Sequence, residues 1–300
     1  MKEIVLITGA NGMVASRLAT ILLPFYSVRF LTRTPRKEEE FEWDISQKYI
    51  DTRAFDQVSH IIHLAGADIS EKKWTPQRKM EIRSSRIDSA QLILDTLNEQ
   101  KRTIKSFITA SAIGYYGDSI HQNPLDESAP KGVGFLSDVV VEWEQIADQF
   151  FLSKVAERVV KIRTGVILAQ KKGALSKMVQ QIQWGVGAPL GSGNQLMSWI
   201  HIDDIVYIYK FALEQEKWNG VFNAVAPEKN SNKELTIQIA SILKKKLILP
   251  NIPAWFLRII FGEMAQVLLD SNNISSEKLE NAGYSFRFKN LRSALEDLLN

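Results

Sequence analysis

The chain of 300 residues contains no cysteine and only four histidines, His60, His63, His121 and His201. Without cysteine it can form no disulfide bond and has no thiolate nucleophile or cysteine ligand for a metal. The four histidines do not stand at the spacing of metal ligands, so we predict no metal site. Hydroxyl, carboxyl, amide and basic side chains remain for any chemistry that the protein performs.

The sequence also lacks long apolar runs and a strong charge of one sign. No apolar run approaches the roughly 18 residues that a membrane span requires, and the chain reads directly into a strand rather than a signal peptide. The formal net charge is +3, and the densest basic groups, 33–37 and 244–246, are too short for an extended nucleic-acid surface. We expect a cytoplasmic protein that binds neither membrane nor nucleic acid. A homodimer stays open.

Short apolar runs alternate with segments of helical periodicity. Apolar residues at three- and four-residue spacing indicate helices, and short apolar runs bounded by polar residues indicate buried strands. The strands are expected at 4–8, 28–32, 60–64, 106–110 and 159–163, and the helices at 13–23, 76–99 and 136–151. Because parallel neighbours need crossover connections, this alternation predicts an α/β fold with a Rossmann-type doubly wound parallel sheet.

The alternation loosens after about residue 170, which suggests a second region. We predict a dinucleotide-binding domain over 1–170, which also receives 195–225. A smaller, helix-rich substrate-side region is predicted over 171–300, with a tail segment at about 248–300. The apolar stretch "PAWFLRIIFGEMAQVLL" (253–269) is expected to form a helix buried against the main domain. A dimer surface is the second interpretation and a membrane-lying helix the third.

The stretch "LITGANGMVAS" (6–16) places two glycines between the first predicted strand and the first predicted helix. The unpaired N–H groups and the dipole of a helix N-terminus favour an anion. Gly9 and Gly12 let the backbone approach a diphosphate where a Cβ atom would hinder it, and Ala15 is small enough for close helix-to-sheet packing. We predict dinucleotide binding here; a tight turn without a ligand is the alternative.

The second predicted strand ends without the acidic residue that would bind the ribose 2′-hydroxyl of NAD. The chain reads "LTRTPRK" there, with Arg33 and Arg36 in place of an acid. A guanidinium forms charge-assisted hydrogen bonds to a 2′-phosphate, on the order of 1.5 to 3 kcal/mol each. NADP(H) is therefore predicted in preference to NAD(H), with a solvated basic turn as the alternative.

Five motifs resemble the extended, nucleoside-sugar-epimerase-like branch of the short-chain dehydrogenase/reductase superfamily. They are "TGANG" (8–12), "HLAG" (63–66), "TASAIGYYG" (109–117), "RTGVIL" (163–168) and "WIHIDD" (199–204). Longer pieces, including "KWTPQRKMEIRSSRI", "GFLSDVVVEWE" and "FGEMA", are similar to the epimerase family proteins that once carried a cell-division-inhibitor label. The resemblance covers nearly the whole chain. It implies a Rossmann fold, a dinucleotide cofactor and a small hydroxy or keto compound or nucleotide sugar as substrate.

The resemblance also implies site residues, most of them for the cofactor. The cofactor-binding residues would be Gly9, Asn11, Gly12, Met13, Val14, Arg33, Arg36, Asp44, Leu64, Ala65, Gly66 and Ser111. Asp44 would meet the adenine amine, unless it only caps a helix; Ala65 and Gly66 could instead be close-packing residues. Ser111 matches the catalytic Ser or Thr, which orients a substrate oxygen; a hydrogen bond to its own loop is the alternative.

The Tyr-x-x-x-Lys pair of hydride-transferring members is missing, which is a departure from the pattern. Its Tyr exchanges a proton with the substrate, and its Lys lowers the pKa of that Tyr and holds the nicotinamide ribose, but Phe135 and Val139 stand at the two positions. Tyr116 is our first substitute as catalytic proton donor, with Asp138 and Lys131 as further candidates. A packing role is the alternative for Tyr116.

Two residues near the predicted substrate side have competing interpretations. His201 is expected to be a structural histidine before a helix capped by Asp203, with a catalytic base as the alternative. Asn223 would frame a ligand. Two function classes therefore stay open: an NADP(H)-dependent oxidoreductase or epimerase with a nonstandard active site, and a cofactor-binding sensor or regulatory partner with little or no turnover.

Overall fold

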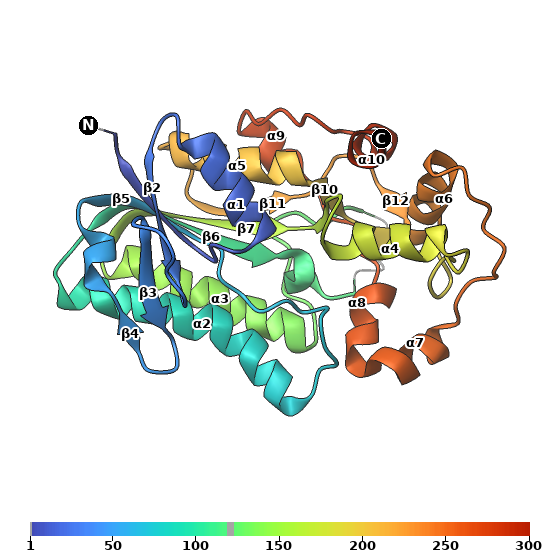
Figure 1. Cartoon of the computed structure of the whole chain (residues 1–300), viewed down its shortest axis with the longest axis horizontal. Coiled ribbons are helices and arrows are strands. Elements are labelled where there is room, and N and C mark those ends of the chain that lie inside the picture. Colours follow the sequence, from blue (N-terminus) through green and yellow to red (C-terminus); the bar gives the residue numbers. More distant parts are fainter. Residues whose placement is uncertain (1, 119–122) are drawn as a thin grey trace.

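The computed structural model describes residues 2–118 and 123–300, and an eight-stranded sheet forms its centre (Figure 1). The strand order is β11-β7-β6-β5-β1-β2-β3-β4, and neighbours are parallel except for β3 and β4. The strands are β1 (Ile4–Thr8), β2 (Ser27–Thr32), β3 (Glu40–Asp44), β4 (Tyr49–Ile50), β5 (Val58–His63), β6 (Ile104–Ala112), β7 (Ala156–Thr164) and β11 (Gly220–Ala224). The order reverses at β1, and such sheets bind ligands at the carboxyl ends of their strands beside this point.

Helices cover both faces of the sheet (Figure 1). They are α1 (Met13–Leu22) and α5 (Ile202–Glu214) on one face, and α2 (Pro76–Glu99) and α3 (Phe135–Leu152) on the other. Val5 and Ile7 of β1 pack in the core with α1 and α5, and Leu6 packs in the core with α2 and α3. A strand buried on both faces is apolar throughout. The predicted α/β fold with a doubly wound, mostly parallel sheet is confirmed.

The remaining elements are short, and α4, α6, α7 and α8 lie together at the right of Figure 1. The helices are α4 (Gly173–Gln183), α6 (Asn232–Ile242), α7 (Ala254–Phe261), α8 (Ala265–Leu269), α9 (Glu277–Asn281) and α10 (Leu291–Leu299), with 3-10 turns η1 (Thr52–Phe55), η2 (Ile113–Tyr116) and η3 (Gly262–Met264). β8 (Val166–Leu168) pairs with β10 (Trp199–His201), and β9 (Leu196–Met197) pairs with β12 (Asn230–Ser231).

Most predicted elements occur within a few residues of their expected bounds. The helix 76–99 has the predicted ends. It starts at Pro76 because the hydroxyl of Thr75 caps its first turn and proline fits the first helical position. Strands β6 and β7 are several residues longer than predicted because they pair with each other along almost their whole length. β11 was not predicted as a strand, and it extends the sheet by pairing with β7.

The prediction of one buried helix over 253–269 was wrong. Gly262, with a φ of 61°, ends α7, and the chain continues through η3 into α8. In α7 only Leu257 is buried, whereas Trp255 and Ile259 are 63% and 68% exposed. Apolar residues around the whole helix gave no indication of which side meets the main domain. Among the described residues, no helix is both long and apolar enough to cross a bilayer.

Candidate functional site

The turn between β1 and α1 has a backbone that only glycine fits. Gly9 has a φ of 74°, and a Cβ atom there would lie 2.9 Å from the carbonyl oxygen of Leu64. The N–H of Gly12 donates to the carbonyl of Gly9 at 2.8 Å and closes the turn. No side chain caps the start of α1. The first N–H groups of this helix therefore stay available for an anion, as in a phosphate-binding turn.

The other residues predicted for this turn lie at its rim. Asn11 is exposed, and Met13 and Val14 are the half-buried first residues of α1. The methyl group of Met13 approaches Gly173 at the start of α4. The start of α1 thus lies close to the start of α4.

Arg33 follows β2 directly and is exposed. Its side chain has no hydrogen bond or ion pair with any residue that the structure describes. Arg36 is also exposed, and its backbone N–H donates to the carboxylate of Glu40 at 2.7 Å. Arg33 thus offers an unpaired guanidinium at the same sheet edge as the glycine turn, because β1 and β2 are parallel.

Asp44 ends β3 and caps the turn that follows it through the N–H groups of Ser46 and Gln47, as the alternative interpretation expected, although that turn does not form a helix. Its Oδ1 accepts hydrogen bonds from the N–H and the hydroxyl of Ser46, at 2.8 and 2.6 Å. The hydrogen bond from the Ser46 hydroxyl holds the pKa of Asp44 below its ordinary value, and the charge of Arg33 lowers it slightly further. The proposed contact between Asp44 and adenine stays a prediction.

A buried histidine fixes the segment opposite the glycine turn. Thr8 Oγ1 accepts hydrogen bonds from the N–H groups of Leu64 and Ala65, each at 3.0 Å, so its own proton goes to Nδ1 of His63, also at 3.0 Å. His63 therefore carries its proton on Nε2 and donates to Ser89 Oγ at 3.1 Å. Burial lowers the pKa of His63 to about 4, so the ring is neutral at pH 7.

Ser111, near the end of β6, is 4% exposed and belongs to a buried network. Its hydroxyl donates to Oε1 of Glu144 on α3 at 2.6 Å. Arg163 at the end of β7 holds both oxygens of that carboxylate, with its Nε and Nη2 each 2.8 Å away. The single hydroxyl proton of Ser111 is thus already used within the protein, and its oxygen can only accept a further hydrogen bond.

Tyr116 belongs to the same network. Its hydroxyl donates to Oδ1 of Asn223 at 2.8 Å and accepts from Nη1 of Arg163 at 3.0 Å. Burial raises the pKa of Tyr116 to about 12, and its side chain is almost fully enclosed. Asn223 is also fully buried, so the structure encloses both residues away from the surface. This environment supports the packing alternative for Tyr116, whose role as proton donor stays a prediction.

Glu144 and Arg163 were not identified from the sequence as site residues. The only signal was a charged residue within an apolar helix pattern and another at the end of an apolar strand, positions that are usually buried. Nothing in the sequence indicated that these two positions face each other.

The two side chains at the positions of the missing Tyr-x-x-x-Lys pair lie in apolar surroundings. Phe135 packs edge-on against Trp74 with 5.3 Å between ring centres, and Val139 is buried. Lys131 and Asp138 form an exposed ion pair at 2.9 Å. These side chains give no buried, free proton donor in the place of the pair.

His201, which was expected to be structural, is fully buried and caps α5 itself. Its Nδ1 accepts the N–H of Asp203, so the prediction that Asp203 is the cap was wrong. Nε2 of His201 lies 3.3 Å from Asp297, and these two residues and Asp203 could together offer three ligand atoms to a metal ion. Asp203, however, also forms ion pairs with Arg17 and Arg287, which compete with a cation. His121 lies outside the described residues.

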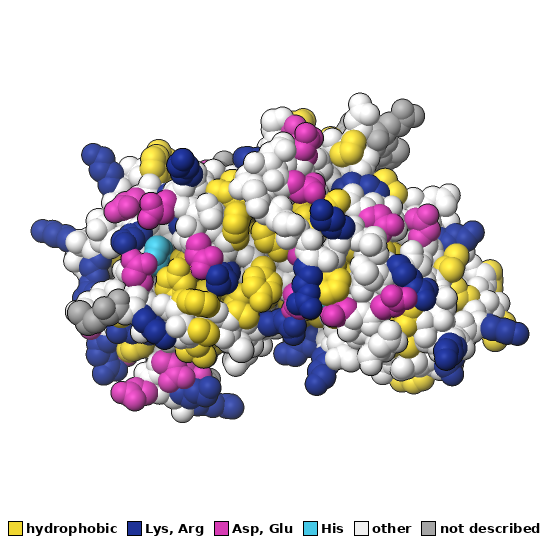
Figure 2. All heavy atoms as spheres, turned by 90° about the horizontal axis from the view of Figure 1, so that it is seen from above, with side chains coloured by type: hydrophobic (Ala, Val, Ile, Leu, Met, Phe, Trp, Pro, Cys, Tyr) yellow, Lys and Arg dark blue, Asp and Glu magenta, His cyan; other side chains and the backbone are white. Residues whose placement is uncertain are grey.

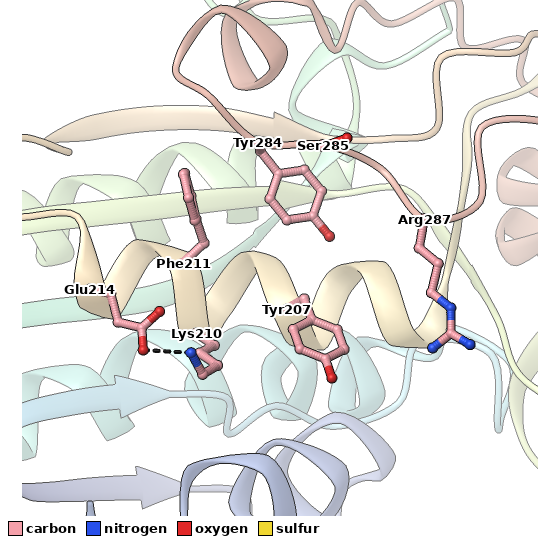
Figure 3. A pocket seen from close by; sticks show the side chains of 7 residues that line it. All are labelled: Tyr207, Lys210, Phe211, Glu214, Tyr284, Ser285 and Arg287. Atoms are coloured by element: carbon pink, nitrogen blue, oxygen red, sulfur yellow. Dashed lines mark hydrogen bonds and ion pairs between the residues drawn. The ribbon is translucent and has the colours of Figure 1, made fainter. Parts of the chain in front are cut away.

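A shallow hollow of about 400 Å³ opens between α5 and the segment that follows α9 (Figure 3). It is lined by Tyr207, Lys210, Phe211, Glu214, Tyr284, Ser285 and Arg287. Its charges are already paired, Lys210 with Glu214 at 2.5 Å and Arg287 with Asp203. None of the predicted cofactor or catalytic residues line it, so we place the functional site at the sheet edge instead.

The face shown in Figure 2 carries both signs of charge. Lys and Arg side chains are interspersed with Asp and Glu, and apolar side chains lie between them without a continuous basic area. This distribution does not resemble the basic stripe of a nucleic-acid surface. The absence of a nucleic-acid partner stays a prediction.

Known proteins resemble this chain over its full length. An epimerase family protein from Staphylococcus aureus is 32% identical over 304 residues, covering 98% of each chain. The structure of human epimerase family protein SDR39U1 with NADPH matches with a TM-score of 0.86 and 26% identity, covering 98% of each chain. A nucleoside-diphosphate sugar epimerase from Corynebacterium glutamicum matches with a TM-score of 0.81 and 28% identity, covering all of this chain and 58% of that one.

Two family descriptions match separate parts of the sequence. A domain of unknown function, DUF1731, matches residues 252–298, and the NAD dependent epimerase/dehydratase family matches residues 5–133. The second match contains the glycine turn, Arg33 and Ser111. Together with the full-length similarity, these matches show that the chain belongs to the NAD-dependent epimerase/dehydratase family, among the epimerase family proteins.

Proposed function

We propose that the protein binds NADP(H) across the carboxyl ends of β2, β1 and β5. The observation that carries this proposal is the glycine turn, where Gly9 packs against the backbone of Leu64 and no side chain caps the first N–H groups of α1. A diphosphate fits such a turn. The NADPH in the structure of human SDR39U1 supports the same cofactor class.

The direction of the cofactor follows from Arg33. With the diphosphate at β1, the adenosine half extends towards β2, where the unpaired guanidinium can bind a 2′-phosphate through charge-assisted hydrogen bonds. The nicotinamide half then extends towards β5 and β6, where Gly66 and Ser111 lie. This arrangement favours NADP(H) over NAD(H).

The proposed activity is that of an oxidoreductase or epimerase on a small hydroxy or keto compound or a nucleotide sugar. A bound nicotinamide would supply hydride transfer. Ser111 would orient the substrate by accepting a hydrogen bond from a substrate hydroxyl, because its own proton is used by Glu144. Such an enzyme would work without the Tyr-x-x-x-Lys pair, and its substrate proton would come from a group other than Ser111.

A second candidate function is a cofactor-binding sensor or regulatory protein with little or no turnover. It is favoured by the same network, because the protons of Ser111 and Tyr116 both point to internal partners. Oxidation of NADPH by a broad panel of carbonyl compounds distinguishes the two candidates. Turnover with any of them supports the enzyme, and NADPH binding without turnover across the panel supports the sensor.

Arg33→Ala tests the cofactor proposal directly. Loss of one or two charge-assisted hydrogen bonds should weaken NADPH binding by about tenfold to a hundredfold and leave NADH binding nearly unchanged. The measurement is a fluorescence titration with each nucleotide. Arg292→Ala is the matched control, since Arg292 is an exposed arginine that pairs with Glu296 on α10. Equal losses for NADPH and NADH would reject the role of Arg33.

A further inference from the structure

Arg86, on α2, is a largely enclosed cation without a carboxylate partner. Its Nη1 donates to the carbonyl of Ile82 at 2.9 Å and its Nη2 to the carbonyl of Ala67 at 3.1 Å. Within residues 2–118 and 123–300 no acidic side chain forms an ion pair with it. The negative charge of Asp68 raises the pKa of Arg86, but Asp68 forms no ion pair with it, and its Oδ1 accepts hydrogen bonds from the N–H and the hydroxyl of Ser70.

This guanidinium lies at the carboxyl end of β5, inside the proposed site. A Cβ atom on Gly66 would be 3.1 Å from Cζ of Arg86, so the glycine leaves room for the guanidinium. The N–H of Ala67 donates to Ser85 Oγ at 2.9 Å, so α2 holds Ala67 through both its N–H and its carbonyl. The guanidinium also lies over the ring of Trp143 on α3, with its Cζ 5.2 Å from the ring centre.

Arg158, which is 8% exposed, illustrates an arginine whose hydrogen bonds serve the fold alone. Arg158 donates three hydrogen bonds to the carbonyls of Ala212, Leu213 and Trp218, at and beyond the C-terminal end of α5. That helix end carries a partial negative charge that offsets the cation. Arg86 instead donates to the carbonyl of Ile82 within α2, to Ser85 Oγ at 3.4 Å and to a single loop carbonyl, which leaves its Nε–H and one N–H of Nη2 unused by the described residues. Burial lowers its pKa to about 10, so it is still charged at pH 7.

Arg86 and Arg33 lie on opposite sides of the glycine turn. β2, which leads to Arg33, and β5, which leads to Gly66, flank β1 on opposite sides. The nicotinamide half of a dinucleotide held at Gly9 would therefore reach the Arg86 side. Val139, where a lysine of the Tyr-x-x-x-Lys pair would stand, lies one helical turn before Trp143.

We propose that Arg86 binds the nicotinamide half of the cofactor, donating its spare N–H groups to the ribose hydroxyls in place of the lysine absent at position 139. This inference rests on the proposed function. It assigns the two ends of the cofactor to two different arginines, Arg33 for the adenosine half and Arg86 for the nicotinamide half.

The test compares NADPH with adenosine 2′,5′-bisphosphate, which has the adenosine half but no nicotinamide ribose. Arg86→Gln should weaken NADPH binding by about tenfold, as expected for one charge-assisted hydrogen bond, and change bisphosphate binding by less than about twofold. Arg86→Lys, which keeps the charge, should recover part of the NADPH affinity. Arg33→Ala is the matched control and should weaken binding of both nucleotides. All affinities are measured by titration calorimetry.

Other outcomes would overturn the inference. Equal losses for both nucleotides in Arg86→Gln would show that Arg86 only shapes the loop at Ala67, and unchanged NADPH affinity would show that it does not bind the cofactor. If Arg86→Gln does not fold, Arg86→Lys is decisive: a loss confined to NADPH supports the inference, and no loss or an equal loss rejects it. A wild-type protein that binds neither nucleotide would reject the proposed function itself.

Discussion

The two ends of the sheet edge treat their hydrogen-bond donors in opposite ways. At the glycine turn, the N–H groups at the start of α1 are uncapped and Arg33 has no partner among the described residues. At the end of β6, Ser111 and Tyr116 donate their protons to Glu144 and Asn223, which are themselves buried. The donors of the first end are free for an anionic ligand, and we call it the open end; the side-chain donors of the second end are already paired within the protein, and we call it the closed end.

The difference shows that two parts of one sheet edge can be built by separate physical means. The glycine turn depends on backbone geometry, which persists whatever the neighbouring side chains do. The closed end depends on a charge pair in a low-dielectric interior, where every donor and acceptor needs its partner. Breaking each end separately therefore tests whether the two are independent.

The largest effect is expected from Glu144→Ala. It leaves the Arg163 guanidinium buried without its carboxylate, which costs about 3 to 5 kcal/mol in the free energy of unfolding. Chemical denaturation measures this loss. If the two ends are independent, the folded variant should bind NADPH with an affinity within about threefold of the wild type, a factor worth less than 1 kcal/mol.

Two further variants serve as controls for this prediction. Glu144→Leu combined with Arg163→Met removes both charges, and should cost less than Glu144→Ala because no buried charge is left unpaired. Glu214→Ala breaks an exposed pair with Lys210 and should cost less than about 0.5 kcal/mol. A double variant less stable than the single one would contradict this account of the closed end.

Acidification should act on the open end through His63. Its pKa is about 4 in the folded protein and 6.5 in the unfolded chain, so the unfolded chain gains a proton first as the pH falls. The free energy of unfolding should therefore decrease below about pH 6.5, with a contribution of about 3 kcal/mol lost by pH 4. Denaturation curves between pH 7.5 and pH 4, a range of about 3.5 units that spans both values, measure it.

Comparison with His63→Gln isolates this contribution. Burial also lowers the pKa values of His60 and His201, while burial raises the pKa of Asp270 to about 6, which acts in the opposite direction. These groups are present in both proteins, so their effects cancel in the difference. The variant should lose less stability on acidification than the wild type, and identical slopes would show that His63 does not titrate as described.

The open end could be predicted from sequence because its parts are local. Strand β1, the two glycines of the turn and the first residue of α1 all lie within residues 4–13, and Arg33 is the first residue after β2. Parallel pairing alone brings their ends together. The same local rules placed the helix 76–99, where Thr75 and Pro76 mark the start.

The closed end could not be predicted because its contacts are distant in sequence. Ser111 meets Glu144 33 residues later, and Tyr116 meets Asn223 107 residues later. Such pairings depend on the register of β6, β7 and β11, which periodicity does not give. The prediction of a buried helix over 253–269 failed for a related reason. When all sides of a helix are apolar, the sequence does not show whether a residue such as Trp255 faces the core or the surface.

Apart from the control variants, the smallest effect is expected from Tyr116→Phe, which tests whether this residue has a structural or a catalytic role. The variant leaves Nη1 of Arg163 and Oδ1 of Asn223 without their buried partner, a cost of about 1 to 3 kcal/mol in the free energy of unfolding. Tyr115→Phe is the matched control, because the Tyr115 hydroxyl has no hydrogen bond in the described part of the chain.

If Tyr116 only stabilises the closed end, its loss lowers stability and leaves NADPH affinity and any NADPH oxidation at the wild-type level. If Tyr116 is the proton donor, oxidation falls by about a hundredfold or more in a protein that still binds NADPH, since general acid catalysis contributes on that order. A phenol whose pKa is about 12 and whose proton is held by Asn223 is poorly suited to exchange it. We therefore expect the first result, with thermal unfolding and single-turnover assays on the same preparations as the measurement.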